Sequence, residues 1–380
     1  MKQIKNLLNI GSGDIIGSGI TAAFWFYLAT LMNPDSFGEL HYFISIAGIV
    51  SYFTLIGSQN TITVYVAKKI PIQSTFNFIS LIGGIIGFVI LYILFQRIDI
   101  GFLVFGYIIY NLATGELLGK QEYKNYFKYI IIQKILTPVL GLSLFFILDI
   151  QGVIYGLSIS YIFFSVLIIK NFSKVKIDFK LLYPRKGFII NNYLNGLSGT
   201  LHGQVDKIIV MPILGASLLG NYSLSLQIIS MMMIFSAILY KYMLPQETAG
   251  HNIDQIKKLL IFSSIILTII GFFIVPMILP SIFPKYTDAI EPIKIMSFSI
   301  IPMSICKIYT SKFLSMEKSK VIFIGSITST AILIPTMIAF GIWFDISGIA
   351  ASFVLATVIQ ASYYYVSAKK LNKGENTAIQ

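Results

Sequence analysis

Long apolar runs separated by short polar segments make up most of this sequence. Each run has about the twenty residues that a helix needs to cross the hydrocarbon core of a bilayer. The pattern therefore predicts an all-α integral membrane protein with about twelve transmembrane helices. The predicted spans lie near residues 10–32, 40–66, 75–95, 100–118, 129–148, 152–170, 188–213, 218–243, 259–279, 292–311, 321–344 and 347–368.

The overall composition supports this class. Hydrophobic residues make up 56% of the 380 positions, charged residues only 12%, and the mean hydropathy is +0.80. These values lie far outside the range of soluble domains. The first apolar run is too long for the core of a cleaved signal peptide, so we expect it to be a retained span. The single cysteine, Cys306, excludes an internal disulfide and a cysteine-cluster metal site.

The basic residues are distributed unevenly between the two sets of loops. Both termini and every second connection together hold 21 lysines and arginines, while the other connections hold only Arg97 and Lys285. By the positive-inside rule, both termini are cytoplasmic, and the chain is a multi-pass protein of the inner cell membrane. This topology also explains the net charge of +12, so we expect no nucleic-acid partner.

Short motifs recur along the chain at fixed offsets. LGKQEYK (118–124) returns as LSMEKSK (314–320), and DIQGV (149–153) returns as DISGI (345–349), both 196 residues later. FGELHYFISI, which follows the first span, resembles LGNYSLSLQI, which follows the seventh, at an offset of 182. Two motifs that share one offset indicate duplication.

The duplication predicts two lobes of six spans each. We expect an N-terminal six-helix lobe over 1–170, a basic cytoplasmic linker over 171–186 and a C-terminal six-helix lobe over 187–380. Because each lobe has an even number of spans, the repeat is parallel, related by an axis along the membrane normal. Two six-helix bundles around a central cavity are typical of alternating-access transporters.

The stretch GSGDIIGSG (11–19) resembles a glycine-rich phosphate loop but lacks the spacing of one. Ile16 stands where a dinucleotide fingerprint has its third glycine, and no Gly-Lys-Ser/Thr follows. The stretch instead lies in the first span, where Asp14, Ser18 and Thr21 share one helical face. We predict that Asp14 faces the cavity and couples transport to an ion, since acids within spans are costly unless they face a wet interior. The alternative is a first-turn acid neutralised by an interfacial lysine.

A second polar cluster lies in LHGQVDK of the seventh span. His202 and Asp206 are four residues apart and share a helical face, so we predict a proton-sensitive, ion-coupling pair. Gln204 and Lys207 lie beside them and are predicted to bind substrate. The alternative is a helix-packing network, with Lys207 extending to the outer surface.

Three further lysines interrupt predicted spans on their cytoplasmic sides. Lys134, Lys241 and Lys307 are predicted to line a basic inner vestibule for a phosphorylated headgroup, because lysine is a good point-charge partner for phosphate. The alternative is that each side chain extends to the interface. Gln59 and Asn60, at the end of the second span, are weaker candidates for substrate binding.

The sequence carries no recognisable catalytic or metal-binding constellation. The histidines His41, His202 and His251 are scattered, and neither Gly-x-Ser-x-Gly nor His-Glu-x-x-His occurs. We therefore expect no catalytic residue, no metal and no cofactor, and a transporter rather than an enzyme.

Several stretches resemble one transporter family. LMNPDSFGEL (31–40), GSQNTITVYVAKK (57–69) and especially VDKIIVMPILGASLLGNYSLSLQI (205–228) resemble the polysaccharide transporters, the flippases of O-antigen and capsule repeat units. That family is part of the multidrug/oligosaccharidyl-lipid/polysaccharide flippase superfamily. The chain departs from the lipid II flippases in lacking extra terminal spans, and it is poor in arginine, so lysines would have to hold a diphosphate.

The resemblance implies a function. It implies transport of an undecaprenyl-diphosphate-linked oligosaccharide from the cytoplasmic to the outer leaflet, with the lipid tail kept in the bilayer. It also implies coupling to protons or sodium, and contact with the polysaccharide polymerase and the chain-length machinery. Three alternatives stay open: a cation antiporter of the multidrug and toxin extrusion type, a membrane enzyme of polysaccharide polymerisation, and a purely structural membrane scaffold, which would need neither Asp206 nor the repeat.

Overall fold

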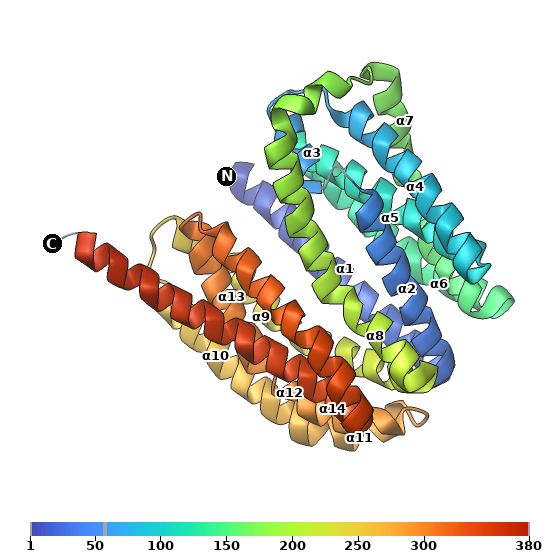
Figure 1. Cartoon of the computed structure of the whole chain (residues 1–380), viewed down its shortest axis with the longest axis vertical. Coiled ribbons are helices and arrows are strands. Elements are labelled where there is room, and N and C mark those ends of the chain that lie inside the picture. The colour runs from blue at the N-terminus through green and yellow to red at the C-terminus, as the bar shows by residue number, and fades with distance from the viewer. Residues whose placement is uncertain (1, 56–58, 379–380) are drawn as a thin grey trace. The chain divides into compact units, whose positions relative to one another are not determined.

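The computed structural model describes the backbone of residues 2–55 and 59–378, and the side chains of 16–55, 59–170, 172 and 175–371. Within these residues all regular structure is helical. The helices are α1 (Lys2–Leu31), α2 (Pro34–Thr54), α3 (Gln59–Ala67), α4 (Gln73–Phe95), α5 (Ile98–Gly119), α6 (Tyr123–Ser160), α7 (Ser165–Lys174), α8 (Lys186–Met232), α9 (Ile234–Thr248), α10 (Asp254–Ile269), α11 (Val275–Ile282), α12 (Ile290–Ser297), α13 (Ile300–Ser315) and α14 (Ser319–Ala378) (Figure 1). Short 3₁₀ turns occupy Ile162–Phe164, Phe179–Leu181, Tyr183–Arg185 and Thr287–Ala289, and a π-helix occupies Ile270–Ile274.

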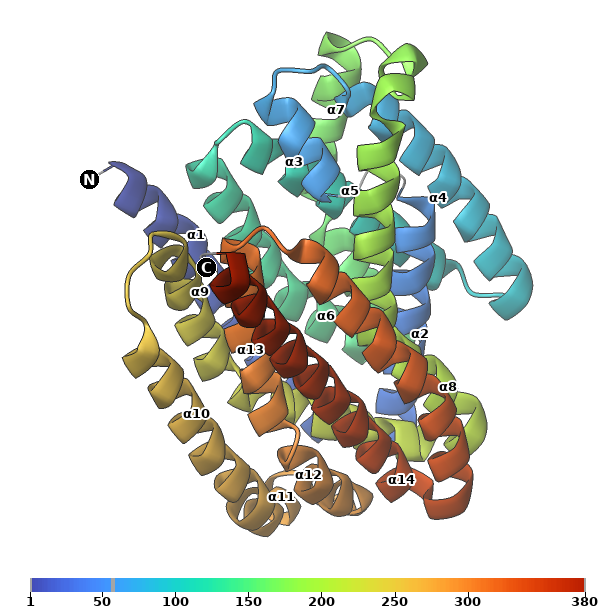
Figure 2. The ribbon, with the colours of Figure 1, turned by 60° about the vertical axis from the view of Figure 1, so that its left-hand side comes forward.

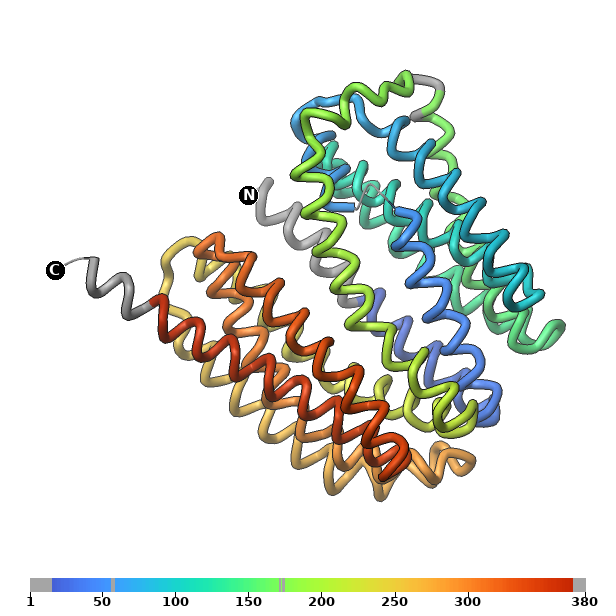
Figure 3. Tube along the Cα trace, in the orientation of Figure 1, coloured from blue at the N-terminus to red at the C-terminus, as the bar shows by residue number. Residues whose placement is uncertain are grey.

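Three of the long helices are each interrupted by a reversal of the chain. The backbone is non-helical at Asp149 in α6, at Gly215 in α8, and at Phe344 and Asp345 in α14. Figure 3 traces the reversals, and Figures 1 and 2 show the two halves of α14 side by side. Each of these elements is therefore a helical hairpin.

The described chain contains helices suited to crossing a membrane. Six of its helical stretches are long and apolar enough to cross a bilayer, and two bent helix pairs raise the number to eight. Three of the six run for 48, 54 and 53 residues, more than twice the length of one crossing, and contain the reversals just described. If each half of these three is a separate crossing, and the shorter apolar helix Ile16–Leu31 is another, the described chain accommodates the predicted spans.

The repeated motifs adopt the same conformations in both halves of the chain. Asp149 has φ 53° and ψ −134°, and Asp345, 196 residues later, has φ 51° and ψ −139°. Gln121 and Glu317 are separated by the same offset, and each has a φ of 58° at the end of a helix. The motifs that repeat in the sequence therefore also share backbone conformations at these positions.

The chain forms two compact units that differ from the predicted lobes. Unit 1 contains residues 1–24 and 42–204, and unit 2 contains 25–41 and 205–380. The last seven residues of α1 and the start of α2 belong to unit 2, while the first part of α8 belongs to unit 1. One long helix can contribute residues to both units. The hydropathy pattern gives the ends of a helix but does not show which unit each part of it contacts.

A central helix organises the packing within each unit. In unit 1, α5 packs against α3, α4 and α6, and its residues Leu103, Val104 and Ile108 are fully buried. In unit 2, α13 packs against α9, α10 and α14, and its Phe313 is fully buried beside Tyr364. Many outward-facing side chains are large and apolar, as expected for helices that meet lipid.

Candidate functional site

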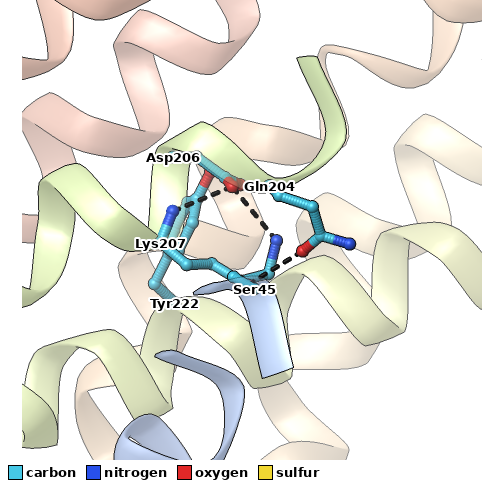
Figure 4. A network of polar contacts seen from close by, with 5 residues as sticks. All are labelled: Ser45, Gln204, Asp206, Lys207 and Tyr222. Atoms are coloured by element: carbon cyan, nitrogen blue, oxygen red, sulfur yellow. Dashed lines mark hydrogen bonds and ion pairs between the residues drawn. The ribbon is translucent and has the colours of Figure 1, made fainter. Parts of the chain in front are cut away.

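A buried ion pair lies in the α8 hairpin. The Asp206 side chain accepts a hydrogen bond from the Lys207 ammonium at 3.1 Å and another from the Tyr222 hydroxyl at 3.1 Å. The backbone N–H of Lys207 also donates to Asp206 Oδ1. The backbone is non-helical at Gly215, between Asp206 and Tyr222, and the change of direction there lets the Tyr222 hydroxyl reach the carboxylate. Figure 4 shows these side chains.

The ion pair is buried, so its charges would be costly without compensation. Asp206 is only 4% exposed, and Tyr222 is fully buried. A charge removed from water is costly unless it is paired and hydrogen-bonded, and here the carboxylate has both forms of compensation. The Lys207 contact lies within one helix, so the link between the two halves of α8 is the Tyr222 hydroxyl.

His41 belongs to the same unit and was not predicted as a site residue. It lies on α2, is 4% exposed, and packs its ring against Phe37 at 4.5 Å and Trp25 at 4.9 Å between centroids. It also interacts electrostatically with Lys207. The internal repeat could have identified His41 as a candidate. An offset of 182 aligns it with the polar residue Ser223, which is next to Tyr222 in the sequence.

Gln204 lies two residues before Asp206 but makes its contact within unit 1. Its Oε1 atom accepts a hydrogen bond of 2.8 Å from the buried Ser45 hydroxyl on α2 (Figure 4). A Cβ atom at Gly48, one turn further along α2, would be in ordinary contact with the Gln204 side chain at 3.7 Å. The sequence cluster LHGQVDK is thus divided between two packing environments.

His202 also belongs to unit 1, where it is half-buried on α8. The hydrogen bonds of Asp206 go to Lys207 and Tyr222 rather than to His202. Helical spacing predicted a shared face for the two residues, but it could not show that Asp206 has other hydrogen-bonding partners. Asp14 lies outside the residues whose side chains the structure describes.

Lys134 on α6 packs its aliphatic chain against α1. A Cβ atom placed at Gly17 would lie 3.0 Å from Lys134 Cγ, so the glycine provides the space that the lysine occupies. Lys134 is half-buried there, in unit 1.

Lys241 and Lys307 lie on neighbouring helices of unit 2. Lys307, on α13, is half-buried, and its ammonium lies 5.6 Å from the centre of the Tyr240 ring on α9. Lys241 follows Tyr240 on α9 and is exposed. The structure therefore places two of the three predicted vestibule lysines on adjacent helices.

Gln59 and Asn60 begin α3 in unit 1. The Gln59 carbonyl accepts a hydrogen bond from Thr63, and its backbone packs closely against Gly115 on α5. Asn60 is exposed. These contacts give Gln59 a packing role.

The described residues contain no group of three or more histidine, cysteine, aspartate or glutamate side chains placed to hold a metal ion. Charged, hydroxyl and amide groups make up the polar contacts just described. Such groups can bind an anion or exchange a proton without a bound metal.

Comparisons with known proteins show the fold. No protein-family model matches the chain. An uncharacterized membrane protein of Methanocaldococcus jannaschii is 24% identical over 364 residues, which cover 85% of this chain and 87% of that protein. That similarity extends over most of both chains.

Solved structures of MOP superfamily transporters are similar over nearly the whole chain. The inward-closed lipid II flippase MurJ has a TM-score of 0.78, with 13% identity over 95% of this chain and 87% of its own. An inward-facing multidrug resistance transporter of the MATE family has a TM-score of 0.73, with 13% identity over 95% and 96%. A Pyrococcus furiosus transporter, described as having a binding pocket of reverse polarity that suggests a different function, has a TM-score of 0.63, with 13% identity over 96% and 95%. The chain has the fold of MOP superfamily transporters.

Proposed function

We propose that this protein is an alternating-access flippase for a polyprenyl-diphosphate-linked oligosaccharide, such as an O-antigen or capsule repeat unit. It moves this lipid from the cytoplasmic to the outer leaflet of the cell membrane, with both of its own termini in the cytoplasm. The fold, which it shares with a lipid II flippase, and the lysine-rich loops on one side support this assignment.

The half-buried cation of Lys307 carries the proposal. It lies on α13 against the Tyr240 ring, and a second lysine, Lys241, follows Tyr240 on α9. Like charges placed close together in a partly desolvated region repel, and an incoming anion relieves that repulsion. A diphosphate is therefore a better occupant of this region than a cationic drug.

The ion pair at Asp206 also favours a lipid flippase over a cation antiporter. A cation antiporter of the multidrug type needs a carboxylate that an organic cation can approach. Here the carboxylate is already compensated by Lys207 and Tyr222. The pair is better suited to ion coupling, in which a proton or sodium ion competes with Lys207 for Asp206.

Coupling is proposed for Asp14, His202 and Asp206 together. Acids and histidines inside spans are the usual groups that bind protons in transporters. A proton or sodium ion bound in one state of the protein and released in the other would drive the exchange of states. The substrate leaves toward the outer surface, where contact with the polymerase and the chain-length machinery would follow.

The connections between the units are suited to such motion. The chain passes from one unit to the other after residues 24, 41 and 204, inside α1, α2 and α8 respectively. Movement of one unit relative to the other would therefore bend these helices rather than displace a loop.

A reconstituted flipping experiment tests the proposal. The purified protein is placed in vesicles that carry a fluorescent diphosphate-linked polyprenyl oligosaccharide, and an impermeant quencher reports which leaflet holds the label. Loss of one charge-assisted phosphate contact predicts that Lys307→Ala slows flipping by about tenfold or more. Lys307→Arg should keep part of the rate, because the charge remains.

Lys318→Ala provides the matched control, because Lys318 is an exposed residue just after α13. The Lys318→Ala variant should flip the labelled lipid at the wild-type rate. Equal flipping by wild type and Lys307→Ala would remove the observation on which the proposal rests. Transport of a cationic dye without lipid flipping would favour the antiporter, and extension of the oligosaccharide would favour the polymerisation enzyme.

A further inference from the structure

An apolar groove of about 330 Å³ lies in unit 2, and its lining includes neither the Asp206 pair nor Lys241 and Lys307. It is formed by the second half of α1, the second half of α8, and α11. All eight lining side chains are apolar, and they are Phe26, Ile228, Met231, Val275, Ile278, Leu279, Ile282 and Phe283.

The groove has a buried floor and an exposed rim. Leu279 and Phe283 are 3% and 7% exposed, while Met231, Ile278 and Ile282 are about half exposed. In a membrane-spanning unit, a rim of this kind opens toward hydrocarbon. The shape therefore admits a flexible chain from the bilayer rather than a solute from water.

The helix beside the groove departs from regular geometry. Residues Ile270–Ile274 form a π-helix, and Pro276 and Pro280 follow in α11. A π-turn and prolines both disturb the regular pattern of backbone hydrogen bonds and bend the helix. These features shape α11 where it borders the groove, and π-turns of this kind are frequent at functional sites.

A cation lies beyond one end of the groove. Lys285 follows the lining residue Phe283 by two positions and is exposed, and its ammonium donates to the Leu31 carbonyl at 3.4 Å. Leu31 lies five residues beyond Phe26 on α1, about 7.5 Å along the helix. Lys285 is also one of only two cations in the loops that the charge distribution assigns to the outer side, and the other, Arg97, is paired with Asp99.

We propose that this groove holds the hydrocarbon chain of a phosphorylated membrane lipid, with the phosphate at Lys285. The inference rests on the proposed function and deepens it, because it assigns a binding site in unit 2 to a lipid with a phosphorylated headgroup. The apolar lining selects the chain, and the lysine selects an anionic head over a zwitterionic one. Exposed carboxylates at Asp288 and Glu291 follow one turn later and oppose an anion there, so Asp288→Asn should strengthen the preference.

Fluorescence quenching tests the site directly. The two tryptophans are replaced by Trp25→Phe and Trp343→Phe, and a single reporter is introduced in the groove by Phe26→Trp. The protein is reconstituted in phosphatidylcholine vesicles with a minor fraction of either brominated phosphatidic acid or brominated phosphatidylcholine. We expect about fivefold preferential quenching by the acid, the preference that one lysine near an anionic lipid supplies.

Two variants make the result specific. Lys285→Ala should abolish the headgroup preference, while Lys285→Arg keeps it. A reporter at Met277→Trp, on α11 but 77% exposed, should show no preference, because it samples bulk lipid. Equal quenching by both lipids at position 26, or a preference that survives Lys285→Ala, would overturn the proposal.

This result is separable from the proposed function, because quenching measures binding and not transport. Preferential quenching in a protein that flips no diphosphate-linked sugar would leave the lipid site standing and remove the flippase. Flipping without preferential quenching would support the flippase and remove the lipid site.

Discussion

Gly38 packs against a backbone carbonyl at the start of the second half of α8, and Gly220 packs against one at the start of α2. A Cβ atom at Gly38 would lie 1.9 Å from the Ala216 oxygen, and one at Gly220 would lie 1.9 Å from the Pro34 oxygen. The glycines are 182 residues apart, and so are Pro34 and Ala216, which is the offset of the sequence repeat. The contact is therefore reciprocal, and equivalent positions of the two repeats pack on each other within unit 2.

The first prediction is that neither glycine tolerates a methyl group. A carbonyl at such a distance cannot move without shifting a helix, so Gly38→Ala or Gly220→Ala should cost at least about 1–3 kcal/mol in stability, as overpacking does. The thermal transition of the detergent-purified protein, followed by size-exclusion chromatography, measures this cost.

Gly199→Ala is the matched control for that prediction. Gly199 also lies in α8, and nothing lies within 4 Å of a Cβ atom built there. The variant should melt at or above the wild-type temperature, since alanine favours a helix over glycine. A wild-type transition in Gly220→Ala would contradict the reciprocal contact.

The second prediction separates a functional Asp206 from a structural one. Asp206→Asn leaves the amide oxygen able to accept from Tyr222 but removes the carboxylate charge that pairs with the buried Lys207 ammonium. Breaking a buried pair costs about 3–5 kcal/mol, so the single variant should be less abundant in the membrane. The double variant Asp206→Asn with Lys207→Met removes both charges and should regain abundance.

Flipping by the double variant then shows the role of the carboxylate. If Asp206 couples ions, the abundant double variant stays inactive, and Asp206→Glu keeps partial function. Wild-type flipping by the double variant would show that the pair contributes only to the fold. Tyr222→Phe tests the remaining contact and should lower stability, because a buried hydrogen bond to a charged group is lost.

The third prediction concerns the hairpin tips at Asp149 and Asp345. Both have positive φ with strongly negative ψ, a conformation that glycine adopts without steric cost and other residues adopt with strain of about 1–3 kcal/mol. Asp149→Gly and Asp345→Gly should therefore raise the melting temperature, and Asp149→Val should lower it, because a β-branched side chain fits this region worst.

Asp288→Gly is the comparison for the hairpin variants. Asp288 is exposed in a 3₁₀ turn and has no positive φ, so glycine there should only add freedom to the unfolded chain and lower stability slightly. Stabilisation of all three glycine variants alike would argue against strain at the tips.

The fourth prediction concerns orientation. Lys176 is an exposed residue in the basic segment between the α7 and α8 helices, which the positive-inside rule assigns to the cytoplasm. In a Cys306→Ser background, a cysteine replacing Lys176 should resist an impermeant thiol reagent added to intact cells. It should react after the cells are opened, and labelling of intact cells would reverse the topology.

The sequence by itself determined the class of the fold and its duplication. A bilayer imposes its thickness on every crossing helix and leaves no water for unpaired backbone groups, so span length and hydrophobicity can be read locally. The repeats could also be recognised from the sequence. The recurring motifs contain Gln121 and Glu317 in one case and Asp149 and Asp345 in the other, and each pair shares a backbone conformation.

Only the tertiary structure decided which polar side chains meet. Helical spacing predicted that His202 and Asp206 share a helical face, and it gave no sign that the Tyr222 hydroxyl and the Lys207 ammonium both contact the carboxylate. The part played by His41 likewise depends on which face of α2 packs inside unit 2. Such choices depend on contacts between residues far apart in the chain, whereas the hydrophobic pattern records only which residues avoid water.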